Sequence, residues 1–410
     1  MRTYFKRVPL RSWGIIILCG FAGMLFYVDR QTLSVLKTTL QATWGLSDID
    51  YGWLVAAFMT PYTLCYLISG RLIDRWGTRT MMPLFLLGMS LATVAGGLAQ
   101  GFWSLGASRV VLGLAEAGII PAVMVAIVTW FPADMRGTAT TINKPLTVAG
   151  RILVVPFAAG VAAWQSWRWA FIIPGLLGAV CAALWWFTDK HAPVTPRAAA
   201  QPLPRYRDVL ANQAIRGLLL ARLVSDPLWF FLMFWQPGFL QERLGLSLAD
   251  LGRLGWIPSV AALPFIMALG HLSDGWVRQG AAPVQSRVRV LIGLTVIAPA
   301  ALLLTHTTSV PLALALLSLL QVMTASWLSF SGLLMSDLVP RRMVGTTVAL
   351  MSALGAMAGA AFNLVAGPLV QAFGYDHLMW VGALLHPIAA VILWRAYSRR
   401  ADPLAGAAPA

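Results

Sequence analysis

Charged residues are scarce in this sequence. Only 11% of its 410 residues are Asp, Glu, Lys or Arg, whereas soluble domains carry roughly a quarter. Hydrophobic residues make up 59%, and a water-soluble protein of this length has no way to hide so much apolar surface. The composition therefore excludes an ordinary soluble protein and indicates that lipid surrounds the chain.

Cysteine is scarce as well. Cys19, Cys65 and Cys181 stand alone inside apolar segments, which argues against a disulfide framework and against a cysteine metal site. The sequence also contains no evident nucleophile–base pair or cluster of metal ligands, so a membrane enzyme is the weakest interpretation. We expect no enzyme activity, no metal and no cofactor.

Long runs without charge divide the chain into membrane spans. The run between Arg289 and Asp337 is long enough for two helices of about 20 residues. The runs are continuously apolar rather than alternating, which indicates helices and not a barrel. Twelve spans are predicted, at residues 13–36, 51–72, 80–99, 102–130, 137–161, 168–188, 213–240, 250–273, 287–305, 309–335, 344–371 and 377–397.

Two short motifs recur at an offset of 200 positions. GRLIDRWG at 70–77 matches GHLSDGWV at 270–277, and GLSDIDYG at 45–52 matches GLSLADLG at 245–252. Each pair flanks one apolar span, so the chain consists of two copies of one membrane module. Two repeated bundles in one chain are typical of a secondary transporter.

We therefore predict an all-α membrane protein with twelve transmembrane helices in two pseudo-symmetric six-helix bundles. The N-terminal bundle comprises residues 1–188 and the C-terminal bundle residues 213–410. The Pro- and Arg-containing segment 189–212 between them is predicted to be a cytoplasmic linker.

Basic residues predict the orientation. If both termini are cytoplasmic, the outer loops receive only Lys37, Arg168 and Arg243, and the other basic loop residues face the cytoplasm. We predict a multi-pass protein of the cell (cytoplasmic or inner) membrane. The same asymmetry explains the net charge of +15 without a nucleic-acid partner. Residues 1–28 resemble a signal peptide, but no small-x-small cleavage site precedes Asp29, so we interpret them as the first helix.

The repeated motifs suggest loops that switch with the conformation. Gly70 and Gly270 are expected to permit close helix approach, and Asp74 and Asp274 lie near helix ends. There a carboxylate accepts from backbone N–H groups at a neighbouring helix start or pairs with an arginine, in one state of the bundle and not the other. Arg75 is predicted to belong to the same switch loops. The alternative is a merely solvated charged loop.

The first helix carries two adjacent charges in its span. Asp29 and Arg30 point about 100° apart, so they cannot share one direction. Arg30 shares a face with Tyr27, and that face suits an anion in a cavity. Ionisable groups inside a membrane need partners or water, so Asp29 must find its own.

Arg109 and Glu116 lie seven residues apart on one face of the fourth helix. Burial disfavours an ionised Glu116 and a nearby arginine favours it, so this side chain is suited to exchange a proton when the cavity changes side. We predict proton coupling at Asp29 and Glu116. The alternative is static Asp–Arg and Glu–Arg pairs that only hold the bundle together.

Lys144 and Arg151 add two cations to the fifth helix without a carboxylate of their own. They suggest an anionic occupant, or ties to Glu116 or Asp29. Arg151 alternatively reaches an outer headgroup. Lys144 is our predicted substrate contact of the two.

The second half of the chain offers fewer charges. Arg222 and Asp226 are four residues apart and are expected to pair, with a structural role. His386 is expected to be a satisfied packing residue. The predicted substrate contacts here are polar or aromatic side chains inside spans, with Ser326 and Ser329 beside them: Trp229, Gln236, Trp327 and Asn363.

Several segments resemble a known family. The loop at 70–80 resembles the signature of the major facilitator superfamily. Within that superfamily, YVDR at 27–30, RVVLGLAEA at 109–117 and WFP at 130–132 resemble the anion:cation symporter family. DPLWFFLMFWQP at 226–237 is most similar to its hexuronate and sugar-acid branch. Lys144 and the Ser- and Trp-containing tenth helix depart from the hexuronate pattern.

The resemblance implies proton-driven uptake of organic anions. It implies that Arg30, with Tyr27, receives the substrate carboxylate and that Asp29 and Glu116 carry protons, with Arg109 modulating Glu116. Asn363 matches a substrate-facing position. No cofactor is implied, because the proton gradient supplies the energy.

We therefore expect a proton symporter that imports a small organic anion, such as a hexuronate or aldonate, and acts as a monomer. A second cation at Lys144 leaves a dicarboxylate or an aromatic acid open. The rival interpretations are an exporter of drugs or acidic metabolites with the same fold and a membrane sensor that does not transport.

Overall fold

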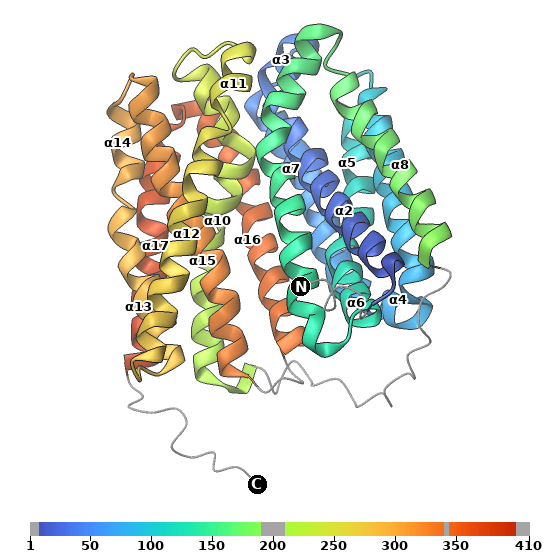
Figure 1. Ribbon diagram of the computed structural model, residues 1–410. Helices are drawn as coiled ribbons and strands as arrows, with labels where there is room; N and C mark the ends of the chain where they lie inside the picture. The colour runs from blue at the N-terminus through green and yellow to red at the C-terminus, as the bar shows by residue number, and fades with distance from the viewer. Residues whose placement is uncertain (1–7, 190–209, 340–343, 399–410) are drawn as a thin grey trace. The chain divides into compact units, whose positions relative to one another are not determined.

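The computed structural model describes residues 8–189, 210–339 and 344–398. Within these residues the regular structure is helical, and no strand occurs (Figure 1). The helices are α2 Leu10–Val35, α3 Lys37–Trp44, α4 Asp48–Gly97, α5 Phe102–Glu116, α6 Ile119–Trp130, η1 Ala133–Met135, α7 Arg136–Trp164, α8 Trp169–Asp189, α10 Gln213–Glu242, α11 Leu248–Leu254, α12 Ile257–Arg278, α13 Pro283–Gly293, η2 Leu294–Ile297, α14 Ala300–His306, α15 Val310–Leu338, α16 Val344–Phe373 and α17 Asp376–Ser398.

The described helices account for the predicted membrane spans. Eleven of them, counting α5–α6, α11–α12 and α13–α14 as single spans, are long and apolar enough to cross a membrane. The 50-residue helix α4 covers two predicted spans. They are separated by a kink at Gly77, whose non-helical backbone angles (φ 72°) favour glycine. The all-α membrane architecture with twelve predicted crossings is confirmed, and the chain is a multi-pass membrane protein.

The repeated motif at 45–52 and 245–252 has the same local structure in both copies. Gly45 and Gly245 have φ of 65° and 70°, and the following serine caps a helix. The Ser47 and Ser247 hydroxyls each accept a hydrogen bond from the backbone N–H three residues later. Such a cap stabilises a helix start by about 1 kcal/mol, so each module begins its second span with the same device.

The chain folds into two compact units. The first, unit 1, contains 1–200 together with 231–260 and 360–372, and the second, unit 2, contains the remaining segments. Unit 1 therefore includes the last part of α10, the helix α11 and part of α16. The division into bundles 1–188 and 213–410 stays a prediction. Most of the linker 189–212 lies outside the described residues.

Glycine permits close packing inside unit 1. A Cβ at Gly113 of α5 would collide with the Phe58 carbonyl of α4, and one at Gly150 of α7 with the Met24 carbonyl of α2. Small residues let backbones approach closely in membrane bundles. These contacts fix how α5 and α7 are turned about their axes, and so which of their side chains face the interior.

Candidate functional site

A buried ion pair joins α2 to the end of α5 in unit 1. The Arg30 Nε donates to Glu116 Oε2 over 2.6 Å, and the two side chains are 6% and 0% exposed. Glu116 is the last residue of α5. The sequence predicted a buried arginine and a buried carboxylate here, and the structure pairs Glu116 with Arg30 by a direct hydrogen bond.

Aromatic rings surround the Arg30 guanidinium. Its central carbon lies 3.7 Å from the Phe26 ring centroid, 4.9 Å from that of Phe58 and 4.1 Å from that of Tyr62. Such contacts stabilise a desolvated cation by up to about 2 kcal/mol each. The rings hold the guanidinium in place, while Arg30 Nη2 and Glu116 Oε1 have no hydrogen-bond partner among the described residues.

Asp29 and Arg109 form the second part of this charged cluster. Asp29 is fully buried, and neither carboxylate oxygen has a hydrogen-bond partner in the described part of the chain. Arg109 is 1% exposed, and its Nη1 donates to the Asp29 backbone carbonyl over 3.3 Å, not to the carboxylate. Two carboxylates and two guanidinium groups therefore share one buried region, and each of the four groups has at least one atom without a hydrogen-bond partner among the described residues.

The face of α7 that carries Arg151 lies beside Tyr27. The Arg151 guanidinium is 5.9 Å from the Tyr27 ring centroid. Lys144, two turns earlier, is exposed and has no ion pair in the described structure. Its neighbour Asn143 is buried, with Oδ1 unpartnered among the described residues. Asn143 is not among the residues predicted from the sequence, although a polar residue inside an apolar span is a signal that points to it.

A second group of charges, which we call the Lys37 lock, comprises Lys37, Asp48 and Glu242. The Lys37 side chain is fully buried and forms ion pairs with Asp48 of α4 and, over 2.7 Å, with Glu242 of α10. Its ammonium also lies 4.9 Å from the Trp235 ring centroid and 5.5 Å from that of Tyr51. From the sequence, Lys37 is expected only as an outer loop charge, because nothing local links it to a residue 205 positions away.

Neutral hydrogen bonds continue the contacts of the Lys37 lock along α4, α10 and α16. The Tyr51 hydroxyl donates to the Phe234 carbonyl over 2.6 Å, and Trp235 Nε1 donates to Asn363 Oδ1 over 2.8 Å. Asn363 Nδ2 in turn lies 3.8 Å from the Met59 sulfur. The predicted substrate contact Asn363 is thus fully buried and bonded to protein, and the predicted contact Gln236 is also buried.

Unit 2 contains the predicted pair on α10. Arg222 Nε and Nη2 donate to the two carboxylate oxygens of Asp226, both over 2.6 Å, which confirms the pairing. Asp226 also abuts α16, where a Cβ at Gly355 would collide with its Oδ2.

Trp229 and Trp327 are also buried in unit 2. The Trp327 and His386 rings meet edge to face, with centroids 5.2 Å apart. His386 Nδ1 has no partner among the described residues. The expectation of a packing residue is confirmed, whereas the expectation that its polar atoms are satisfied is wrong for Nδ1.

The repeated loop motifs differ in their contacts. Asp274 accepts from Arg287 Nη1 over 2.7 Å, so the predicted carboxylate–arginine contact exists, with an arginine of α13. Arg75 lies 5.4 Å from the Trp76 ring centroid. The expected close helix approach at Gly70 and Gly270 is wrong, because a Cβ at either position would meet nothing within 4 Å in the described structure. No group of three or more His, Cys, Asp and Glu side chains that could hold a metal ion occurs among the described residues.

Comparison with known sequences identifies relatives over nearly the whole chain. The D-galactonate transporter of Escherichia coli O6:H1 is 26% identical, with 91% of this chain and 93% of the relative covered. The hexuronate transporter of Escherichia coli K12 is 25% identical over 95% and 94% of the two chains. The probable galactarate/D-glucarate transporter of Bacillus subtilis is 24% identical over 94% and 91%. These relatives are transporters and not enzymes.

Solved structures show the same fold. A bacterial homologue of the human lysosomal transporter Spinster, inward-facing and occupied, superimposes with a TM-score of 0.78 at 22% identity, covering 96% of this chain and 99% of that one. A D-xylose–proton symporter gives a TM-score of 0.71 at 17% identity over 93% and 97%.

The loop signature at 70–80 predicted the superfamily, and this prediction is confirmed. Residues 19–362, most of the chain, match the family described as the Major Facilitator Superfamily. The duplicated motifs and the helical architecture are consistent with that match. The chain belongs to the Major Facilitator Superfamily.

Proposed function

We propose that the protein is a proton-coupled symporter that imports a sugar acid, a hexuronate or an aldonate, by alternating access. The buried Arg30–Glu116 pair carries this proposal, because it leaves one guanidinium nitrogen of Arg30 unpartnered inside a box of aromatic rings. The names of the relatives, a D-galactonate and a hexuronate transporter, support the substrate class. The protein works in the cell membrane with both termini cytoplasmic.

Arg30 is the proposed receptor for the substrate carboxylate. A guanidinium binds a carboxylate best with two parallel N–H donors. Arg30 Nη2 is unpartnered among the described residues, but Nε is occupied by Glu116. Substrate and Glu116 therefore compete for the same group. A proton on Glu116 weakens its hold on Nε and frees Arg30 for bidentate binding, so proton and anion bind together.

Asp29 is the proposed second proton carrier. An ionised carboxylate without a hydrogen-bond donor is costly in a buried site, and Asp29 has none among the described residues. Arg109, held to the Asp29 backbone, sets the electrostatic balance between the two carboxyl groups. If both groups carry a proton for each monoanion, one net positive charge enters, and the membrane potential contributes about 2.3 kcal/mol per 100 mV.

The remaining predicted residues serve the substrate or the conformational change. Tyr27 lies beside the Arg30 face, and Lys144 extends the cationic face of α7. Gln236 and Asn363 of unit 1 are proposed to contact the sugar hydroxyls when the Trp235–Asn363 hydrogen bond is exchanged. Trp229 and Trp327 of unit 2 stay predicted substrate contacts. The Lys37 lock holds one conformation, and the motif residues Gly70, Asp74, Arg75, Gly270 and Asp274 rearrange with the other.

Uptake by the purified full-length chain in proteoliposomes tests this proposal. We expect an inward proton gradient to drive accumulation of radiolabelled D-galactonate or D-glucuronate. Arg30→Gln should abolish binding and uptake, and Glu116→Gln should keep counterflow but lose proton-driven accumulation. Arg289→Gln, which removes an exposed cation of α13, is the matched control. Proton-driven efflux alone would identify an exporter, and binding without counterflow would identify a sensor.

A further inference from the structure

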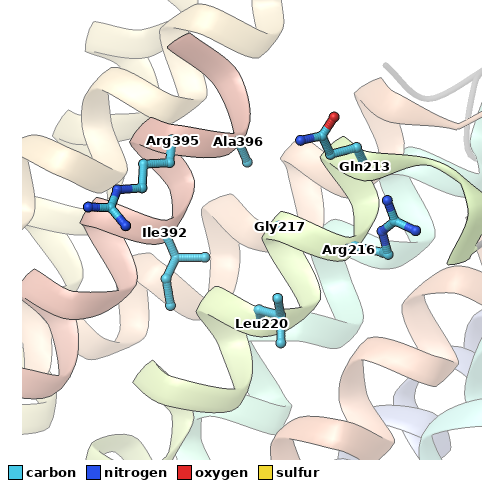
Figure 2. A pocket seen from close by; sticks show the side chains of 7 residues that line it. All are labelled: Gln213, Arg216, Gly217, Leu220, Ile392, Arg395 and Ala396. Atoms are coloured by element: carbon cyan, nitrogen blue, oxygen red, sulfur yellow. The ribbon is translucent and has the colours of Figure 1, made fainter. Parts of the chain in front are cut away.

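A groove on unit 2 runs between the first turns of α10 and the last turns of α17. It has a volume of about 330 Å³ and is lined mostly by apolar atoms, including those of Gly217, Leu220 and Ile392. Figure 2 shows two arginine side chains, Arg216 and Arg395, extending from the two helices on either side of it. No carboxylate lines it among the described residues, so the groove is apolar along its floor and positively charged at its edges.

We propose that this groove binds one phospholipid with an anionic headgroup. Arg216 and Arg395 would contact the phosphate, and an acyl chain would cover Leu220 and Ile392. Basic pockets between transmembrane helices bind anionic headgroups in this way. The side chains of the two arginines have no hydrogen bond or ion pair in the described structure, so both guanidinium groups are available to a phosphate.

The position of the groove along the helices favours a lipid over a soluble anion. Arg216 lies in the first turn of α10 and Arg395 in the last turn of α17, so both are placed where helix ends meet the headgroups. Trp394 beside Arg395 is 58% exposed, and Leu220 is 54% exposed. Tryptophan is enriched at the membrane–water interface, and the exposed Leu220 in the lining of the groove suits an acyl chain.

Contacts within unit 2 hold the groove in shape. A Cβ at Gly217 would collide with the Cβ of Ala396, so the two helices touch at the floor. The Tyr397 hydroxyl donates to the Ala214 carbonyl over 3.1 Å at the end of the groove. Because protein contacts build these walls, a lipid would find the site already formed.

Native mass spectrometry of the full chain in detergent tests the proposal, with phosphatidylglycerol and phosphatidylcholine of identical acyl chains as probes. We expect one tightly bound phosphatidylglycerol and weaker phosphatidylcholine. Each arginine near a headgroup is worth about fivefold in affinity, so Arg216→Gln with Arg395→Gln should weaken binding about 25-fold. Arg216→Lys with Arg395→Lys keeps both charges and should retain most of the affinity, which separates charge loss from misfolding.

The control is Arg278→Gln with Arg289→Gln, which removes two charges of unit 2 outside the groove and should leave binding unchanged. Equal phosphatidylglycerol affinity in the wild type and the groove glutamine variant would overturn the proposal. So would full competition by glycerol phosphate, which would identify a site for a free anion. Occupation of the groove by a second copy of the chain, seen as a lipid-free dimer that the groove variant abolishes, would overturn it as well.

Discussion

Removal of the Lys37 ammonium should loosen the segments of α4 and α10 that it joins in unit 1, and with them α16, which Trp235 contacts through Asn363. In Lys37→Met, Asp48 and Glu242 lose their shared cation, and Trp235 and Tyr51 lose a cation over their rings. Removing one partner of a fully buried ion pair costs about 3–5 kcal/mol. Asp48 and Glu242 are 18% and 31% exposed, so water compensates part of the loss. We expect about 2 kcal/mol, or a thirtyfold shift away from the locked conformation.

Cysteine cross-linking measures that shift. The Ile49 backbone N–H donates to Gln371 Oε1 over 3.4 Å, so these two positions are neighbours on α4 and α16. In a background with the three native cysteines replaced by alanine, Ile49→Cys with Gln371→Cys should cross-link rapidly, and much more slowly once Lys37→Met is added. Glu242→Gln, which removes one of the two ion pairs, should give an intermediate rate.

The control variant Arg289→Met removes an exposed cation from α13 and should not change the cross-linking rate. An unchanged rate in Lys37→Met, despite a lower melting temperature, would refute the reasoning. The ion pairs would then stabilise the fold without selecting a conformation.

Three further predictions concern stability, each measured by thermal or denaturant unfolding in detergent. Arg222→Met leaves Asp226 buried without its bidentate partner and should lower the free energy of unfolding by about 3 kcal/mol. The double variant Arg222→Met with Asp226→Leu should restore most of this loss. Equal losses in the single and the double variant would contradict the prediction. Gly355→Ala places a methyl group against the Asp226 carboxylate and should cost about 1–3 kcal/mol, whereas Gly70→Ala, in open space, should be neutral or stabilising. Asp274→Asn should cost less than about 1 kcal/mol, because Asp274 is 52% exposed; a larger loss would mean that the Arg287 contact is a structural element of unit 2.

Hydropathy and charge predicted the membrane spans because each span must by itself be apolar and satisfy its own backbone hydrogen bonds in lipid. Pairs within one helix were equally predictable, since side chains four residues apart lie about one turn from each other. The Arg222–Asp226 pair therefore followed from spacing alone. The duplicated serine caps belong to the same class of local signals.

Contacts between helices were only partly predictable. The sequence marked Arg30, Asp29 and Glu116 as unusual but did not determine which cation Glu116 binds, because that depends on how α2 and α5 are rotated about their axes. Gly113 sets how α5 packs on α4, and Gly150 sets how α7 packs on α2. By contrast, a Cβ at Gly70 or Gly270, where close helix approach was predicted, would meet nothing within 4 Å in the described structure. A small side chain permits contact but does not create it.

The glycine at position 77 has a mechanical consequence. It is the one position inside α4 with non-helical backbone angles, so a single residue, and not a loop, joins the two membrane crossings of this helix. The first crossing carries Asp48 and Tyr51 of the Lys37 lock. Because so short a connection offers little slack, we expect the second crossing to follow when the contacts of the first are exchanged.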